Sequence, residues 1–346
     1  MKQVIIPIDE CSEGDVLAAD VLNNSGVKLV TSQTVLNIFI INKLADFGVD
    51  RISVFNPPLI TKTREYSYKK FIGNYKESVL LVKDMIHELS AGKRIDYNNI
   101  VSVSDIIYSH VEENANIINC LKQMRGSDEY TYSHSVNTSF YSMLISKWLG
   151  FSEDDIMKAL QAGFLHDIGK SKIPLEILNK TGPLTGKEFS IIKKHPIYGY
   201  YILHENKHID FDIKRAVLLH HERENRSGYP FRLSTDSIGS FARIVSVADV
   251  YDAITSDRVY KKKSTPFKAF EMFLTEGVRQ FDSTVINAFI SNLSTYLIGS
   301  EVLLSTGETG KIAYIPPTNV TAPIIQVGDN YVELSNGGEI TIENML

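Results

Sequence analysis

The stretch His166-Asp167-Ile168-Gly169-Lys170 places a histidine and a carboxylate side by side near the end of a predicted helix. That helix begins at Ser152-x-x-Asp155, which resembles a capping box, and its apolar stripe continues to Phe164. Imidazole and carboxylate together are metal ligands. A single His-Asp pair is common in proteins, so only the surrounding sequence can indicate whether this pair belongs to a metal site.

The surrounding sequence, from about residue 60 to residue 298, is helical in pattern almost throughout. Further helices are predicted over residues 136–148, 185–195, 213–220 and 242–252. The helix that opens at Thr185-x-x-Glu188 is expected to run to His195 and to be broken by Pro196. This central part therefore predicts an all-helical domain.

Both ends of the chain have a different pattern. The first 56 residues mix strand-like runs, such as Arg51-Ile52-Ser53-Val54-Phe55, with one helical stretch that Gly48 ends, and Pro57-Pro58 follows. After Ile298, short β-type runs alternate with Gly, Pro and Asn turns. The expected fold is mainly α, with a helical domain flanked by a small N-terminal α+β module and a small C-terminal all-β appendage.

The expected domain division has four parts. Residues 1–58 form the N-terminal module, whose role is either regulatory or structural, and residues 59–125 form a polar helical connector or the start of the next domain. Residues 126–298 form the helical domain that carries the His-Asp stretch, and residues 299–346 form the β appendage. The polar helical segment is also the part of the chain that would suit a homodimer contact.

Composition and charge exclude several classes of protein. The net charge of −5 argues against a polymeric nucleic acid as partner, because such surfaces are basic. Cys11 and Cys120 are the only cysteines, which excludes a disulfide framework and a Cys-rich zinc site and fits a reducing compartment. The apolar N-terminal run is too short for a signal peptide, and no stretch approaches the length of a membrane helix. We expect a soluble, cytoplasmic protein with no membrane partner.

Five histidines lie within predicted helices or at their ends: His134, His166, His195, His220 and His221. Mixed His and Asp ligands without thiolate suit Fe(II), Mn(II) or Zn(II), and they are common where two metals share a bridging carboxylate. A lone buried histidine is more often a hydrogen-bonded core residue. The ordered set on successive helices is what predicts a metal site here.

The strings that contain these histidines resemble the HD-GYP family of the HD superfamily of metal-dependent phosphohydrolases, over residues 130 to 289. The matching strings are Thr131-Tyr132-Ser133-His134-Ser135, His166-Asp167-Ile168-Gly169-Lys170 with its extension to Leu178, His195-Pro196-x-x-Gly199, His220-His221-Glu222 with Gly228-Tyr229-Pro230, and Val247-Ala248-Asp249-Val250-Tyr251-Asp252-Ala253 with Asp257-Arg258 and Tyr260-Lys261. The resemblance implies that residues 126–298 are a catalytic domain.

The resemblance also implies which residues bind metal. The implied ligands are His134, His166, Asp167, His195, His220, His221 and Asp249. Asp167 would be the bridging carboxylate. Some family members hold a third metal with a glutamate one turn before the first histidine, but Tyr130 stands there in this chain. Two divalent ions are therefore expected, with Fe or Mn favoured over Zn because the ligand set has no sulfur.

Lys170, Arg258 and Lys261 occupy the positions that would contact the phosphates of a substrate. Tyr229 would line the pocket through a hydrogen bond or by stacking on a base, or it would serve a structural turn. The chain departs from the family at Arg226 and Arg232, where glycine is usual. These arginines either add phosphate contacts or strain the loop.

The resemblance implies a bacterial signalling enzyme, a phosphodiesterase in which a metal-bound hydroxide attacks phosphorus in a cyclic dinucleotide. The favoured substrate is the second messenger cyclic di-GMP, cut to the linear dinucleotide and then to GMP. Asp167 and Lys170 are the expected catalytic residues. Two alternatives stay open, namely a phosphohydrolase for another cyclic dinucleotide or nucleotide, and a receptor that binds a cyclic dinucleotide but barely hydrolyses it.

Overall fold

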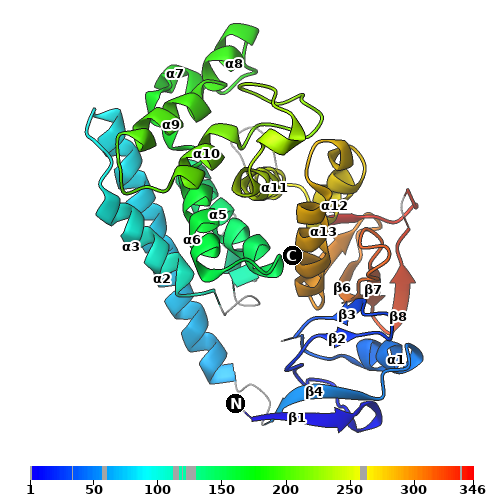
Figure 1. Cartoon of the computed structure of the whole chain (residues 1–346). Coiled ribbons are helices and arrows are strands. Elements are labelled where there is room, and N and C mark those ends of the chain that lie inside the picture. The colour runs from blue at the N-terminus through cyan, green and yellow to red at the C-terminus, as the bar shows by residue number, and fades with distance from the viewer. Residues whose placement is uncertain are drawn as a thin grey trace. The chain divides into compact units, whose positions relative to one another are not determined.

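The computed structural model describes residues 2–32, 34–56, 61–111, 117–118, 120–121, 130–257, 263–335 and 337–346. The chain forms two compact units, and neither is continuous in sequence (Figure 1). One unit comprises Met1–Lys69, Thr265–Glu271 and Phe289–Leu346, and the other comprises Lys70–Ser264 and Met272–Ala288. The four-part division expected from the sequence stays a prediction.

Helices make up the second unit, as the sequence pattern predicts. They are α2 (Thr61–Ser90, which begins in the other unit), α3 (Tyr97–Tyr108), α5 (Tyr130–Trp148), α6 (Glu153–Leu165), α7 (Leu175–Leu178), α8 (Gly186–Ile192), α9 (His195–His204), α10 (Phe211–Leu219) and α11 (Ser240–Thr255), with a 3-10 turn η2 (Ile168–Lys172) after α6. Helices α12 (Pro266–Leu274) and α13 (Ser283–Leu293) each contribute residues to both units.

Local signals in the sequence set several of these helix boundaries. The Ser152 side chain accepts a hydrogen bond from the Asp155 backbone N–H at the start of α6, and Thr185 and Glu188 form a complete capping box at the start of α8. The predicted break at Pro196 is wrong. Helix α8 already ends at Ile192, and Pro196 lies in the first turn of α9, where a missing N–H costs nothing.

Helix α5 is the centre of the helical unit. Its residues from Ser133 to Ile145 are buried on every side, so its small polar side chains lie in the core beside apolar ones such as Phe140. Helix α6 packs very closely against it, because a Cβ at Gly163 would lie 2.6 Å from the Ser139 Cα. The Ser139 hydroxyl donates to the Leu160 carbonyl at 2.9 Å across the same contact. Small residues therefore bring the middle of α5 close to the C-terminal part of α6.

The other unit holds the strands, so the predicted mainly α fold with strands near both chain ends is confirmed. Its elements are β1 (Lys2–Pro7), β2 (Val21–Leu22), β3 (Lys28–Val30), α1 (Ile38–Asp46), β4 (Arg51–Asn56), β5 (Glu301–Leu304), β6 (Thr309–Tyr314), β7 (Ile324–Val327), β8 (Asn330–Glu333) and β9 (Ile342–Met345). Strands β1 and β4 form one antiparallel pair, β2 and β3 another, and the C-terminal strands form an antiparallel sheet in the order β8-β7-β6-β5-β9.

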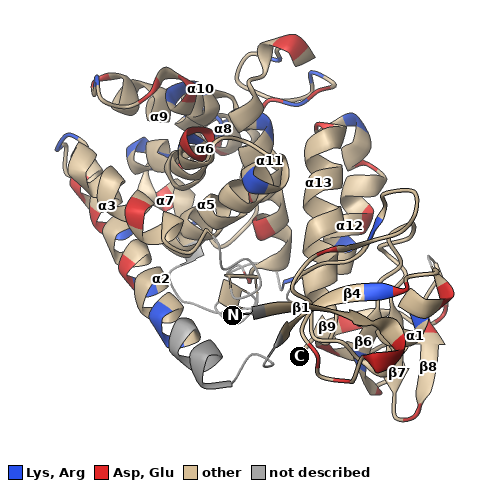
Figure 2. Cartoon of the chain, turned by 60° about the horizontal axis from the view of Figure 1, so that its bottom comes forward, with Lys and Arg blue, Asp and Glu red and all other residues tan. Residues whose placement is uncertain are grey.

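The two chain ends share one core within this unit. Tyr314 of β6 packs into the cluster formed by N-terminal residues such as Leu17, Val30 and Ile40. The buried hydroxyls of Thr31 and Thr295 are hydrogen-bonded at 2.8 Å. Lysines and arginines are interspersed with aspartates and glutamates along the helices and strands (Figure 2). None of the described helices is long and apolar enough to cross a membrane.

Candidate metal centre

A first group of candidate ligands lies where α5 meets the end of α6. His134 of α5 and the adjacent His166 and Asp167 have ligand atoms within 4.8 Å of one another. Asp167 Oδ2 is 3.2 Å from His166 Nε2 and 3.9 Å from His134 Nε2. All three side chains are buried. The close packing at Gly163 is what allows two helices to supply one group.

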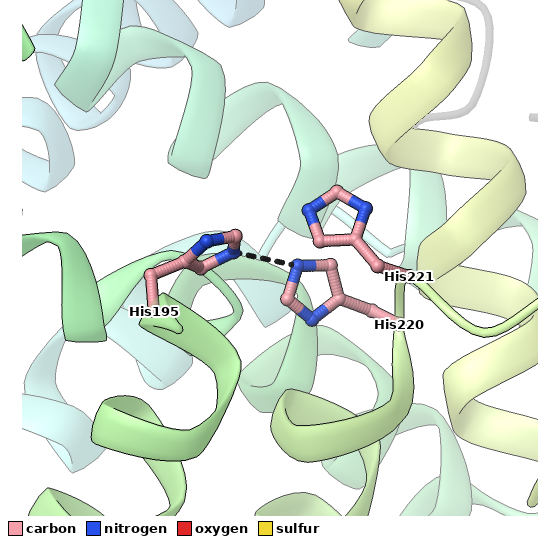
Figure 3. A group of neighbouring side chains, drawn as sticks. All are labelled: His195, His220 and His221. Carbon is pink, nitrogen blue, oxygen red and sulfur yellow. Dashed lines mark hydrogen bonds between the residues drawn. The ribbon is translucent and has the colours of Figure 1, made fainter. Parts of the chain in front are cut away.

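A second group consists of His195, His220 and His221, which also lie within 4.8 Å of one another. His195 opens α9, and the other two histidines follow α10 (Figure 3). Turn η2 sits directly against α9, since a Cβ at Gly169 would overlap the His195 carbonyl oxygen and the Gly199 backbone nitrogen. The glycines of two sequence motifs thus serve one contact, which brings His195 next to Asp167.

Two carboxylates join the groups. Asp167 Oδ1 lies 3.2 Å from His195 Nε2, while its Oδ2 faces the first group. Asp249 of α11 has Oδ1 at 3.1 Å from His134 Nε2 and Oδ2 at 4.0 Å from His221 Nδ1. The structure therefore brings all seven sequence-predicted ligands into one site.

Hydrogen bonds orient three of the imidazoles in the same way. Nδ1 of His166 donates to the Gly163 carbonyl at 2.6 Å, and Nδ1 of His195 donates to the Ile192 carbonyl at 2.8 Å. His220 does the same with the Val217 carbonyl at 2.8 Å. Because each Nδ1 donates its hydrogen to a carbonyl, Nε2 of each ring points towards the site and offers its lone pair there when the ring is neutral.

The contact between His195 and His220 indicates that this orientation of the rings suits cation binding. Their Nε2 atoms lie 3.3 Å apart and are joined by the dashed line in Figure 3. Two neutral rings whose Nδ1 hydrogens bind carbonyls have no N–H left for this contact. Two facing lone pairs are the arrangement expected of ligands that share a cation.

Burial and nearby charges set the protonation of the site. Burial lowers the pKa of His195 to about 4 and holds the pKa of His220 and His221 well below the usual range. For Asp167, burial opposes ionisation, but the nearby His166 and Lys170 outweigh it and hold the pKa well below its usual range. Neutral imidazoles and ionised carboxylates are the forms that bind metal.

Unpaired atoms also point to a cation. His166 Nε2 and Asp167 Oδ1 are buried and have no hydrogen-bond partner within the described chain. Leaving such an atom unpaired costs about 1–3 kcal/mol, unless a metal ion takes the lone pair. A nitrogen and oxygen donor set without sulfur fits a divalent metal.

The loop after His221 folds back over the site. The buried Glu222 carboxylate accepts backbone N–H bonds from Phe231, Arg232 and Leu233 at 2.7 to 3.0 Å. A Cβ at Gly228 would overlap the His221 carbonyl, so only glycine fits there. As a result the Tyr229 ring stacks on His221, with centroids 4.5 Å apart and planes 29° apart.

The two arginines in this loop have backbone angles that favour glycine. Arg226 has φ 62° and Arg232 has φ 56°, and they are the non-glycine residues with positive φ in the described chain. This conformation costs an L-residue about 1–2 kcal/mol. Both side chains are exposed. Arg226 and Arg232, the two positions at which the sequence departs from the family, are thus both strained.

Of the remaining residues predicted for the site, the structure describes the side chain of Lys170. Lys170 is partly exposed and its Nζ is 2.6 Å from Asp167 Oδ2. Arg258 and Lys261 lie outside the described residues, as does the side chain of Tyr130.

Asp252 is a site residue that was not predicted from the sequence, and its Oδ2 accepts a hydrogen bond from His134 Nδ1 at 2.7 Å. Its spacing of three residues from Asp249 puts both carboxylates on one face of α11, which was a usable signal.

Comparisons with known proteins show what this chain is similar to. The family described as "HD domain" matches residues 115–285. A cyclic di-GMP phosphodiesterase of Pseudomonas aeruginosa is 35% identical over 246 residues, which are 71% of this chain and 59% of the relative. A 3'3'-cGAMP-specific phosphodiesterase of Vibrio cholerae is 30% identical over 182 residues, 52% of this chain and 35% of that protein. The chain thus spans less than two thirds of the length of either relative.

A solved structure shows the same fold. Bd1817, an HDG"Y"P protein from Bdellovibrio bacteriovorus, matches with a TM-score of 0.53 and 16% identity, over 83% of this chain and 98% of that one.

Proposed function

We propose that the chain, of which residues 115–285 match the HD domain family, is a metal-dependent phosphodiesterase that hydrolyses cyclic di-GMP. The observation that carries the proposal is the position of Asp167, whose two oxygens face different histidine groups. We infer that the two histidine groups would hold two divalent ions, and that Asp167 would offer an oxygen to each group. The likeness to a cyclic di-GMP phosphodiesterase supports the choice of substrate and a role in second-messenger signalling.

The metal ions, when bound, would lower the pKa of a coordinated water and neutralise charge on phosphate oxygens. The chain's own residues would bind and orient the substrate around them. Lys170 holds a charge at the edge of the site, 2.6 Å from Asp167, and we propose that it contacts a phosphate oxygen. Burial raises the pKa of Tyr229, so its phenol stays protonated and can donate a hydrogen bond to a phosphate or base.

Three arginine and lysine positions complete the proposed substrate contacts. Arg226 lies on the loop whose backbone N–H groups bind the Glu222 carboxylate, and the Arg226 side chain is exposed. Arg258 and Lys261 follow α11, and their part in phosphate binding stays a prediction. The first product would be the linear dinucleotide, and a second cut would give GMP.

A different cyclic dinucleotide is the second candidate, because a relative of similar identity is named for 3'3'-cGAMP. A receptor that barely hydrolyses its ligand is less well supported. All seven candidate ligands lie together here, and burial lowers the pKa of His195, which leaves this imidazole neutral and able to bind metal. A receptor would not need that arrangement.

The test is a product assay with a defined metal. Protein purified without oxygen and stripped of metal is reloaded with Fe(II), Mn(II) or Zn(II), then given cyclic di-GMP, 3'3'-cGAMP or cyclic di-AMP. We expect hydrolysis of cyclic di-GMP above the others, with Fe or Mn more active than Zn because the ligands lack sulfur. Preference for another dinucleotide would establish the second candidate. Tight binding without hydrolysis under every metal would establish the receptor.

A further inference from the structure

We propose that Asp252 is a positioning residue for the candidate metal ligand His134, and that a hydrogen-bond chain from Tyr75 of α2 holds Asp252 in place. The inference rests on the proposed function, because it assigns a role within the same site. Helix α2 precedes residues 115–285, which match the family. The inference therefore makes the metal centre depend on a helix outside the matched domain.

His134 needs a different partner from the other histidines because of its place in its helix. His166 and His220 cap the C-terminal ends of α6 and α10, and His195 follows the end of α8. Each can therefore use a carbonyl that has no partner within its helix. His134 lies inside α5, where the carbonyls of the preceding turn already accept helical N–H groups. A side chain from another helix has to orient this ring.

Asp252 of α11 meets that need. Its Oδ2 accepts from His134 Nδ1 at 2.7 Å, while His134 Nε2 faces Asp249 at 3.1 Å. The ring is thus held on one side and directed into the site on the other. His134 and Asn137 are three residues apart on α5, as Asp249 and Asp252 are on α11, so both helices present matching faces.

The other oxygen of Asp252 is fully used. Its Oδ1 accepts from Asn137 Nδ2 and from the Ser256 hydroxyl, each at 2.9 Å. Asp252 has no exposed surface, and a carboxylate buried in this way needs several donors. Because two donors hold Oδ1, the Asp252 carboxylate is oriented so that Oδ2 faces His134.

Tyr75 sets the orientation of the Asn137 amide. Its hydroxyl donates to Asn137 Oδ1 at 2.8 Å, which leaves the amide nitrogen to donate to Asp252. Tyr75 is itself buried, and its ring packs against those of Phe71 and Phe140. The chain Tyr75, Asn137, Asp252, His134 therefore links α2 to the metal centre through buried hydrogen bonds.

The substitution Asp252→Asn tests whether Asp252 orients His134 or only fills space in the core. An asparagine has nearly the same shape, but its one acceptor oxygen cannot serve both His134 and the donors on the other side. Substituting a residue that orients a metal ligand typically weakens metal binding about 10- to 100-fold. Tyr75→Phe removes one hydrogen bond at the far end of the chain and should weaken binding about threefold to tenfold.

The measurement is the affinity of the metal-free 346-residue chain for Mn(II), by competition with a fluorescent chelator. Tyr314→Phe is the matched control, because that buried hydroxyl has no hydrogen-bond partner in the described chain and lies in the other unit. We expect the order wild type and Tyr314→Phe, then Tyr75→Phe, then Asp252→Asn. Excess Mn(II) should restore most of the activity of Tyr75→Phe.

Other outcomes would overturn the proposal in distinguishable ways. If folded Asp252→Asn and Tyr75→Phe bind Mn(II) as tightly as wild type, the positioning role is wrong and the phosphodiesterase proposal stands. If Asp252→Asn does not fold, the other two variants decide. An Mn(II) affinity equal to that of wild type in both Tyr75→Phe and Asn137→Ala would then overturn the positioning role. If wild type binds no divalent metal, the proposed function fails, and this inference fails with it.

Discussion

Oδ1 of Asp167 lies 3.2 Å from Nε2 of His195, across the gap between two groups of histidines. The other oxygen of the same carboxylate lies 3.2 Å from Nε2 of His166. Asp249, the other carboxylate among the predicted ligands, lies farther from the second group, with 4.0 Å between its Oδ2 and His221 Nδ1. Asp167 is therefore the residue whose loss should affect the whole site.

We expect Asp167→Ala to lower bound metal and to reduce phosphodiesterase activity by more than about a hundredfold. The helical core should stay folded, because α5 and α6 pack through Gly163 and Ser139 and not through this carboxylate. Metal analysis, product assay and circular dichroism check the three statements. Asp154→Ala, at an exposed position near the start of α6, is the control. Full activity in metal-free Asp167→Ala protein would refute the metal-dependent mechanism.

Lys170→Met tests the proposed phosphate contact. Methionine keeps the length of the side chain but removes its charge, and a charge-assisted contact is worth about 1.5–3 kcal/mol, or about 10- to 100-fold in turnover or binding. Metal content should stay near that of wild type, although Lys170 also pairs with Asp167. Lys172→Met, on the same turn and bonded to the Leu89 carbonyl, is the control. Loss of metal in Lys170→Met would mean that the lysine serves the carboxylate instead.

Metal affinity should depend on pH through His134. Burial lowers the pKa of this histidine, but hydrogen bonds with Asp249 and Asp252 outweigh it and raise the pKa to about 9. Below pH 9 the metal-free site therefore holds a proton that an incoming ion must displace. The apparent affinity for Mn(II) should rise with pH, by up to about tenfold per unit, and level off near pH 9.

The same pH dependence has an independent readout. Binding of Mn(II) at pH 7.5 should release a proton, which a titration in weak buffer can count. His195, whose pKa is lowered to about 4, is neutral at this pH and should add nothing. An affinity that does not change between pH 6.5 and pH 9 would contradict the protonation assigned to His134.

Substitutions at Arg226 separate backbone strain from phosphate contact. Arg226→Gly relieves the positive φ of 62° and should stabilise the protein by about 1 kcal/mol, or about 2–4 °C in Tm. Arg226→Ala removes the same charge but keeps a Cβ, so it should not stabilise. If the arginine contacts phosphate, both variants should raise KM at low salt, and the difference should shrink at high salt. An unchanged KM at both salt concentrations would rule out the contact.

The sequence by itself determined the features that depend on neighbours along the chain. The caps at Ser152 and Thr185 begin their helices as predicted, because a cap satisfies backbone groups within a few residues. The ordered motifs also carried the resemblance to the HD superfamily, and the family described as "HD domain" matches residues 115–285. The pairing of β1 with β4 and of β9 with β5 could not be predicted, since the paired strands are distant in sequence.

Only the tertiary structure decided how the ligands share one site. The bond between His134 and Asp252 joins residues 118 positions apart, and no local pattern can place a contact of that separation. The links through Asn137 to Tyr75 likewise depend on how α2, α5 and α11 pack. Close approaches at Gly163 and Gly169 bring the ligand-bearing segments together. Residue types can indicate metal chemistry, but the direction of each lone pair is set by hydrogen bonds that form only when the helices pack.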